Sequence, residues 1–132
     1  KSKIKVVNHL QKSIFTTASP LLEEAFFNIL NNVQKYAPEG KLLEISTTIK
    51  PKTYEIRFKD NGRGIPDKDK KEIFTRLFRK EKKGVIGTGL GLAIVKQVVG
   101  LHSGRVWVED NPSGGAVFVI ELPRNEENQT QE

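Results

Sequence analysis

The feature that most constrains the fold is a wide apolar stripe between residues 20 and 36. Ser19 followed by Pro20 is typical of a helix start, because serine caps free N–H groups and proline fits the first turn. Pro38 and Gly40 end the pattern. Between them the apolar residues recur at helical spacing: Leu21, Leu22, Ala25, Phe26, Ile29, Leu30 and Val33. So wide a stripe must be buried against another layer, which predicts a packed domain.

The covering layer is predicted to be a β-sheet. Six segments are expected strands: residues 4–7, 14–17, 42–50, 54–59, 105–110 and 116–122. The first two indicate an edge hairpin or paired strands. In the next two, apolar residues alternate with polar ones, which favours a sheet with one covered face. Residues 111–115 form the turn of a final hairpin. Together these elements predict an α/β two-layer sandwich.

The remaining segments are assigned to helices and one loop. Residues 67–77 predict a short helix, and residues 79–87 have too few apolar side chains to pack, so we expect a mobile loop there. A further helix is expected from about Thr88 to His102, with Gly104 as its terminator.

Length and composition limit the class of protein. The 132 residues predict one domain, 1–132, with a core at about 4–123 and a polar tail at 124–132. No apolar run approaches the roughly 20 residues of a membrane helix, and no signal peptide is visible. The absence of cysteine excludes disulfides and thiolate metal sites and fits a cytoplasmic location. The absence of methionine predicts a piece of a longer protein, whose partners lie on other sequence.

Basic residues give the chain a net charge of +6, which suits a polyanionic ligand. The cluster Lys68, Lys70 and Lys71 is best interpreted as a solvated face. The cluster from Arg76 to Lys83 borders a glycine-rich segment, where a phosphate-binding role competes with solvation. Nucleic acid is less favoured, because no row of base-stacking aromatic residues is evident.

Glycines at alternate positions mark residues 87–93 (Gly-Thr-Gly-Leu-Gly-Leu-Ala), just before an apolar helical pattern. Such a turn lets the backbone approach a ligand and directs N–H groups and the helix dipole at a phosphate. Alone the signal is weak, since many such turns serve only tight packing.

A polar stripe runs along the first long helix. Asn28 and Asn32 lie one turn apart, with Glu24 before them and Lys35 after them. A neutral amide oxygen suits Mg²⁺ whose charge is balanced by phosphates, and Lys35 would reach a phosphate. Tyr36 either stacks on a base or caps the core. The competing interpretation is a stripe that simply faces water.

Asp60 begins a glycine-rich turn directly after a predicted buried strand. An ionised carboxylate only accepts hydrogen bonds, so it would select the exocyclic amine of adenine over the carbonyl of guanine. Gly62 and Gly64 would let the base lie against the backbone. An ordinary hairpin turn explains the same residues equally well.

Residues 73–79 place two phenylalanines and two arginines before the predicted loop. They form either core and rim or the anchor of a lid, in which case Arg79 reaches a terminal phosphate in bidentate fashion.

Taken together, the motifs resemble those of a known family. Four segments resemble, in order, the N, G1, F and G2 boxes of sensor histidine kinases: residues 28–36, 60–66, 73–79 and 87–95. Residues 101–105 and 118–123 fit the family's closing helix and hairpin. The resemblance implies the Bergerat ATP-binding fold of the GHKL superfamily, with a mixed, mostly antiparallel sheet covered on one face by helices. It differs at Val33, where relatives usually have alanine, and in a short lid at 80–86.

The resemblance also implies roles for individual residues. Asn32 would ligate Mg²⁺ with help from Asn28, and Lys35 and Arg79 would contact phosphates. The residues implied to hold ATP are Asn32, Tyr36, Asp60, Gly62, Gly64, Ile65, Phe78, Gly87, Thr88, Gly89, Leu90 and Gly91.

Related ATPases of the gyrase class carry a glutamate as general base where this chain has Asn28. The resemblance therefore favours transfer of the γ-phosphate over hydrolysis. The acceptor would be a histidine on a separate dimerisation domain of the parent protein, because neither His9 nor His102 lies in a phosphoacceptor motif. A response regulator would act only indirectly, the isolated domain would be monomeric, and no direct membrane contact is expected.

Three other functions stay open at this stage. One is an ATP hydrolase of the same fold with Glu24 as base. The second is a serine kinase of the anti-sigma-factor kind, and the third is a nucleotide-binding module without phosphotransfer.

Overall fold

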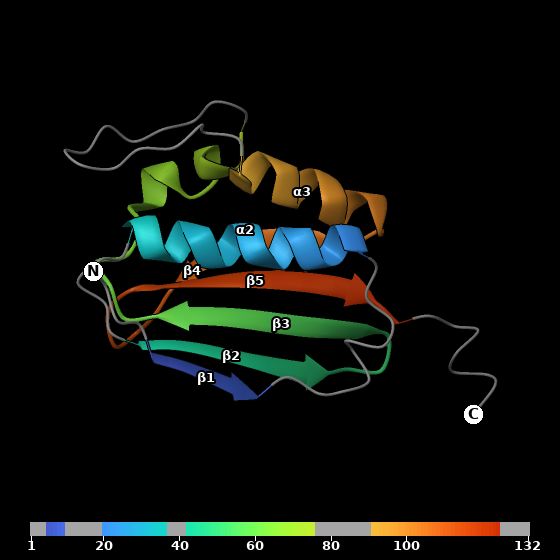
Figure 1. The fold of residues 1–132 in the computed structure, drawn as a ribbon, viewed down its shortest axis with the longest axis horizontal. Helices are drawn as coiled ribbons and strands as arrows, with labels where there is room; N and C mark the ends of the chain where they lie inside the picture. Colours follow the sequence, from blue (N-terminus) through green and yellow to red (C-terminus); the bar gives the residue numbers. More distant parts are fainter. Residues whose placement is uncertain (1–4, 10–19, 37–41, 76–90, 125–132) are drawn as a thin grey trace.

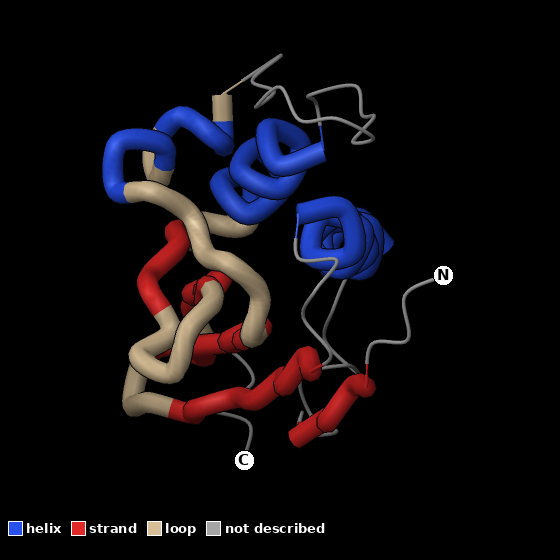
Figure 2. The backbone as a smooth tube through the Cα atoms, turned by 90° about the vertical axis from the view of Figure 1, so that its left-hand side faces the viewer, coloured by secondary structure: helices blue, strands red, loops and turns tan. Residues whose placement is uncertain are grey.

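The computed structural model describes residues 5–9, 20–36, 42–75 and 91–124, and it describes side chains within 20–33, 43–75 and 91–124. Two layers are visible in Figure 1: helices lie across one face of a five-stranded sheet. Figure 2 shows from the side that both long helices lie on the same side of the sheet. The elements are β1 (Lys5–His9), α2 (Pro20–Tyr36), β2 (Leu42–Ile49), β3 (Thr53–Asp60), η1 (Asp67–Asp69), η2 (Glu72–Phe74), α3 (Gly91–Leu101), β4 (Arg105–Asp110) and β5 (Ala116–Pro123). The predicted two-layer sandwich is confirmed.

The strands lie in the order β1-β2-β3-β5-β4. β1 pairs with β2 in parallel, whereas β2 with β3, β3 with β5 and β5 with β4 are antiparallel. The sheet is therefore mixed and mostly antiparallel, as the resemblance implied. β1 is the predicted edge strand, and the strand predicted at 14–17 lies outside the described residues. This order places the end of β3 beside the start of β5, where the candidate site lies.

The core lies between α2, α3 and the sheet. Alternate residues of β3 and β5 point at the helices, among them Phe58, which pairs in register with Phe118; both are almost fully buried. The ring of Phe26 on α2 meets that of Phe58 at a centroid distance of 5.9 Å. Packing of this kind explains why the stripe on α2 forms a helix, since burial of one face supplies most of its stability.

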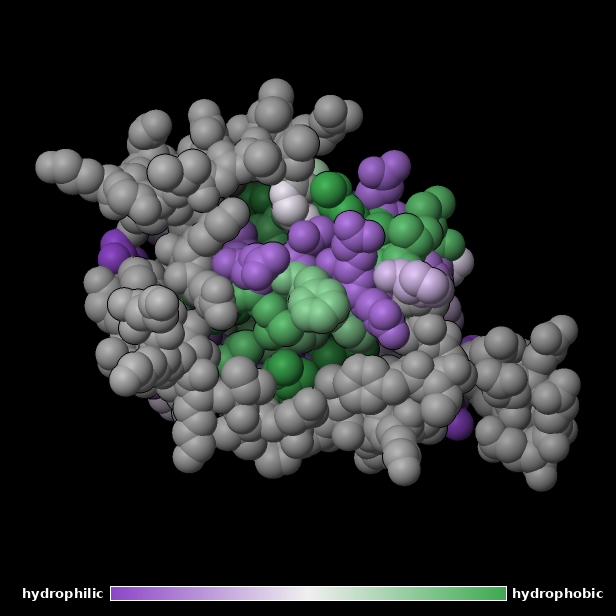
Figure 3. Space-filling view, viewed as in Figure 1, coloured by the Kyte–Doolittle hydropathy of each residue, from purple (hydrophilic) through white to green (hydrophobic). Residues whose placement is uncertain are grey.

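The outer face of the helix layer is not purely polar. Leu21 was predicted to belong to the buried stripe, but 49% of its surface is exposed, because its position points away from the sheet. Phe27 and Leu101 are exposed as well. In Figure 3 hydrophobic and hydrophilic side chains lie side by side over α2 and α3. Among the described residues no helix is long and apolar enough to cross a membrane.

The segment predicted as a short helix at 67–77 forms two separate 3₁₀ turns, η1 and η2, in its described part. Of this charged segment, Phe74 is buried and Ile73 packs partly against the core. Two apolar residues are too few to support a continuous α-helix, which explains the error.

The end of α3 also differs from expectation. The N–H of Gly104 donates to the carbonyl of Val99, and the N–H of Ser103 donates to that of Gly100, both at 2.9 Å. This is a Schellman cap, and Ser103 rather than Gly104 takes the left-handed conformation, with φ 62°. Gly104 is needed for a different reason: a Cβ there would lie 2.3 Å from the carbonyl oxygen of Glu121.

The sheet face opposite the helices carries a chain of ion pairs. Arg57 pairs with Glu55 at 3.0 Å and with Glu109 at 3.1 Å, and Lys50 pairs with Glu55 at 3.2 Å. Burial alone would raise the pKa of Glu55, but the hydrogen bonds and charges of Lys50 and Arg57 outweigh it and hold that pKa below its ordinary value. The hydrogen bond from Trp107, with help from Arg57, likewise lowers the pKa of Glu109.

These lowered pKa values predict acid sensitivity. A carboxylate with a depressed pKa stabilises the fold above its ordinary value of 4.5 and loses that contribution as the pH falls through the folded value. We expect the midpoint temperature of thermal unfolding to decrease as the pH is lowered from about 5 to about 3, and to decrease less in Glu55→Gln than in the wild type. Thermal denaturation followed by circular dichroism measures this, with Glu72→Gln, at an exposed site, as control. The same pH slope in Glu55→Gln and in the wild type would contradict the assignment.

Candidate functional site

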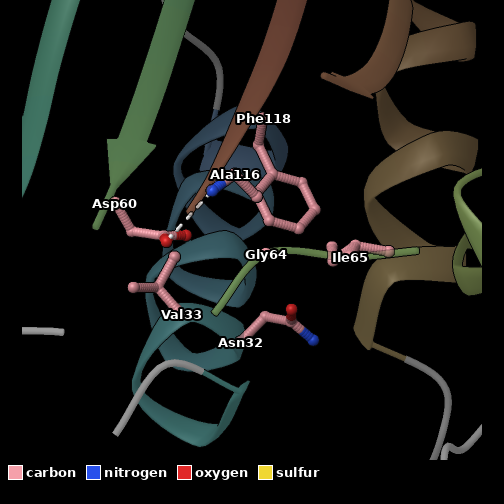
Figure 4. A pocket seen from close by; sticks show the side chains of 7 residues that line it. All are labelled: Asn32, Val33, Asp60, Gly64, Ile65, Ala116 and Phe118. Atoms are coloured by element: carbon pink, nitrogen blue, oxygen red, sulfur yellow. Dashed lines mark hydrogen bonds between the residues drawn. The ribbon is translucent and has the colours of Figure 1, made fainter. Parts of the chain in front are cut away.

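A hollow opens where α2, the end of β3, the following loop and the start of β5 meet. The hollow is open on one side, and its unfilled space, open solvent included, is about 240 Å³. The residues around it, drawn in Figure 4, are Asn32, Val33, Asp60, Gly64, Ile65, Ala116 and Phe118. Four of these seven were predicted site residues from two separate motifs: Asn32 on the helix, and Asp60, Gly64 and Ile65 after the strand. The structure therefore brings these two motifs together.

Asp60 is the most tightly held polar group of the hollow. It ends β3 and is 5% exposed. Its Oδ1 accepts hydrogen bonds from the N–H of Gly62 at 2.9 Å and the N–H of Ala116 at 3.2 Å. Among the described residues, none donates to Oδ2. One oxygen is therefore fixed by the backbone, and the other remains able to accept a hydrogen bond from a ligand.

The turn between β4 and β5 supports Asp60 from behind. The side-chain amide of Asn111, itself buried, donates to the carbonyl oxygen of Asp60 at 2.8 Å. Gly115 has a φ of +108°, and a Cβ there would lie 2.2 Å from the same oxygen. No side chain fits at that position. The turn therefore holds the backbone of Asp60 at the hollow.

The loop after β3 forms one wall of the hollow. Gly64 has a φ of +82°, and a Cβ there would lie 3.1 Å from the carbonyl oxygen of Gly115. Gly62 does not line the hollow but donates its N–H to Asp60. The two predicted glycines therefore have different roles, since Gly64 brings the backbone to the hollow and Gly62 orients the carboxylate.

The helix α2 forms another wall of the hollow. Asn32 is half-buried and lines the hollow, as does the buried Val33, where the family resemblance led us to expect a smaller residue. Asn28 lies one turn earlier and does not line the hollow, and Glu24 is exposed. Lys35 and Tyr36 belong to α2, but their side chains lie outside the described part of the structure.

Several predicted site residues fall in a part of the chain that is not described: Phe78, Arg79, Gly87, Thr88, Gly89 and Leu90. Gly91 is the first residue of α3, and a Cβ there would meet no atom within 4 Å. Of residues 73–79, predicted to form either core and rim or the anchor of a lid, Phe74 belongs to the core, where its ring and that of Phe118 pack in a T-shaped arrangement at a centroid distance of 6.3 Å. Phe74 therefore supports the wall of the hollow from the core side.

Sequence reasoning missed five residues of the site, of which Val33 was predicted only as part of the apolar stripe on the helix. Phe118 and Ala116 were predicted only as strand residues, and Asn111 and Gly115 only as parts of a turn. The glycine pair at 114 and 115 did signal a tight turn. Nothing local in the sequence pairs that turn with Asp60, because they meet only through the strand order of the sheet.

Comparison with known proteins places this geometry in a family. Residues 17–126 match the family model of histidine kinase-, DNA gyrase B-, and HSP90-like ATPases. The chain belongs to this family. The resemblance found from the four motifs is thereby confirmed.

Individual relatives agree with this assignment. The sensor histidine kinase TmoS of Ectopseudomonas mendocina is 41% identical over 107 residues, which are 78% of this chain and 11% of TmoS. The mycobacterial sensor histidine kinase MprB superposes with a TM-score of 0.69 at 32% identity, covering 92% of this chain and 80% of that structure. The ATP-binding domain of PrrB from Mycobacterium tuberculosis gives a TM-score of 0.67 at 27% identity, covering 94% and 81%. The chain thus corresponds to about a tenth of TmoS.

Proposed function

We propose that this chain binds Mg-ATP in the hollow and donates the γ-phosphate to a histidine on a separate dimerisation domain of its parent protein. The observation that supports the proposal is the meeting of Asn32 and Asp60 around one hollow. One offers a neutral amide and the other an acceptor-only carboxylate oxygen. These are the groups that a metal-bound triphosphate and an adenine amine require.

The chemistry of the residues around the hollow suits an adenine ring. Oδ2 of Asp60 accepts the exocyclic amine, and guanine is rejected because its carbonyl would face a carboxylate. Gly64 and Ile65 lie along one side of the ring, and Val33 and Phe118 supply apolar contacts. The relative from Mycobacterium tuberculosis is itself named as an ATP-binding domain.

The residues present also fit Mg²⁺ carried by the nucleotide. In the described residues no group of three histidine, cysteine or acidic side chains exists that could hold a metal alone. Mg²⁺ with few protein ligands takes its charge balance from phosphates. Asn32 would hold the ion with help from Asn28, and Lys35 and Arg79 would contact the phosphates. When bound, the ion neutralises charge on the β- and γ-phosphates.

Transfer is favoured over hydrolysis because Asn28 cannot act as a general base at neutral pH. Glu24, the alternative base on α2, is exposed and lies about two helical turns before Asn32. In the transfer a nitrogen of the acceptor histidine attacks the γ-phosphorus. The bond to the β,γ-bridging oxygen breaks, and ADP leaves. Such a domain works where ATP is available, which favours the cytoplasm.

Transfer itself is tested by mixing the domain with γ-labelled ATP, Mg²⁺ and the purified dimerisation domain of its parent protein. We expect acid-labile, base-stable label on the acceptor domain and much slower release of free phosphate. Asn32→Ala is expected to lower the rate at least about tenfold, because positioning of the metal-bound phosphates is lost. Steady phosphate release without any labelled acceptor would instead support an ATPase. Acid-stable phosphoserine on the acceptor would support a serine kinase.

A further inference from the structure

Lys70 connects one wall of the hollow to the turn that holds Asp60. Its Nζ donates a hydrogen bond of 2.9 Å to the carbonyl oxygen of Ile65, a residue that lines the hollow. The same Nζ pairs at 2.9 Å with Oδ1 of Asp110, the last residue of β4, and also with the carboxylate of Asp67. Lys70 was predicted to belong to a solvated face. Its side chain is instead only 18% exposed, whereas Lys68 and Lys71 are exposed.

The position of Asp110 gives these contacts their importance. Asp110 immediately precedes Asn111, whose side chain holds the backbone of Asp60. Lys70 therefore ties the wall at Ile65 to the same turn that fixes Asp60 on the other side. The loop at Ile65 and the backbone of Asp60 are thus attached to the same turn, so the distance between these two sides of the hollow depends on the amine of Lys70.

A contribution to global stability does not explain the arrangement. The side chains of Asp67 and Asp110 are 91% and 70% exposed, and exposed ion pairs contribute little to stability. The bond to Ile65 differs, because it joins a charged donor to a backbone carbonyl at the hollow and so sets the local path of the chain. Loss of this hydrogen bond is therefore expected to change the affinity for the ligand more than the free energy of unfolding.

We propose that Lys70 is a positioning residue of the nucleotide site, which holds the wall formed by Gly64 and Ile65 at the distance that a bound purine requires. This inference rests on the proposed function. Lys70 itself does not touch the ligand. It acts through the carbonyl of Ile65 and the carboxylate of Asp110.

The test compares Lys70→Met with Lys71→Met, which removes the same charge from the adjacent exposed position. Titration calorimetry with Mg-ATP is expected to give a Kd raised threefold to tenfold in Lys70→Met and changed less than twofold in Lys71→Met. Lys70→Arg is expected to bind Mg-ATP with nearly the wild-type affinity, because a guanidinium can donate to both the carbonyl oxygen of Ile65 and the carboxylate of Asp110. Thermal midpoints of the three variants without nucleotide are expected to agree within a few degrees.

Amide hydrogen exchange without nucleotide gives a second measurement. We expect faster exchange at residues 62–66 in Lys70→Met and an unchanged rate there in Lys71→Met. Equal Kd values in Lys70→Met and the wild type would overturn the inference while leaving Mg-ATP binding intact. So would a large fall in the midpoint of Lys70→Met, since Lys70 would then be structural. If the wild type binds no Mg-ATP, the proposed function fails, and unchanged exchange at 62–66 would overturn the positioning role as well.

Discussion

Replacing Asp60 with asparagine is expected to weaken Mg-ATP binding about tenfold to a hundredfold while the domain keeps its fold. The fold survives because the amide oxygen of asparagine still accepts from the N–H groups of Gly62 and Ala116. Those two donors fix the orientation of the new side chain. Its NH₂ group then replaces Oδ2 and faces the amine of adenine, so a charge-assisted hydrogen bond becomes a contact between two donors.

The same substitution is expected to change the choice of base. Guanine presents a carbonyl oxygen where adenine presents an amine, and an NH₂ group suits the carbonyl. We therefore expect the ratio of ATP affinity to GTP affinity to fall in Asp60→Asn. Titration calorimetry with both nucleotides measures the ratio. Asp69→Asn serves as control, because it removes one negative charge from a neighbouring turn that does not line the hollow. Undiminished ATP affinity in Asp60→Asn would refute the assignment of the base contact.

The second large effect is expected in Gly115→Ala, which should destabilise the domain by more than about 3 kcal/mol. Its Cβ would lie 2.2 Å from the carbonyl oxygen of Asp60 and 2.8 Å from Oδ1, with φ at +108°. Both nearby atoms belong to a residue that is held in place on several sides. Relief requires the turn to move away from β3, which would also break the hydrogen bond from Asn111.

Gly114→Ala provides a matched control. Gly114 has a φ of +103°, almost the same as its neighbour, but a Cβ there would meet no atom within 4 Å. The substitution Gly114→Ala should therefore destabilise the domain only by the cost of backbone strain, about 1–2 kcal/mol. Urea denaturation of both variants separates collision from strain, and Mg-ATP titration shows whether Asp60 has moved. Equal losses of stability in the two variants would show that the collision does not matter.

The layers of the fold could be predicted because the information is local. Helical spacing between residues 20 and 36 and alternation in the strands each report one buried face. Prediction failed where tertiary context decides. Leu21 fits the helical stripe but points outward, and Ser103 takes the left-handed position that glycine usually fills. The residues that neighbour Leu21 and Ser103 in the sequence predict neither outcome.

The candidate site divides in the same way. Asn32 and Asp60 were predicted from residue chemistry and motif order, and the structure places both at one hollow. Their supports could not be predicted, because Asn111 meets Asp60 across 51 positions of sequence. Lys70 was misjudged because three neighbouring basic residues look alike in sequence. Only the tertiary contacts of Lys70 with Asp110 and with the carbonyl of Ile65 distinguish it from its neighbours.

The central claim is that a purine and a metal-bound triphosphate share the hollow between Asn32 and Asp60. An amide NMR titration of the labelled domain with Mg-ATP tests it most directly. The account predicts that the resonances of the backbone amides of Gly64, Ile65 and Ala116 and of the side-chain amide of Asn32 shift together with one common Kd. It also predicts that this Kd is higher in Asp60→Asn. Saturable shifts confined to the opposite sheet face, around Arg57 and Trp107, with no change at the hollow, would contradict it.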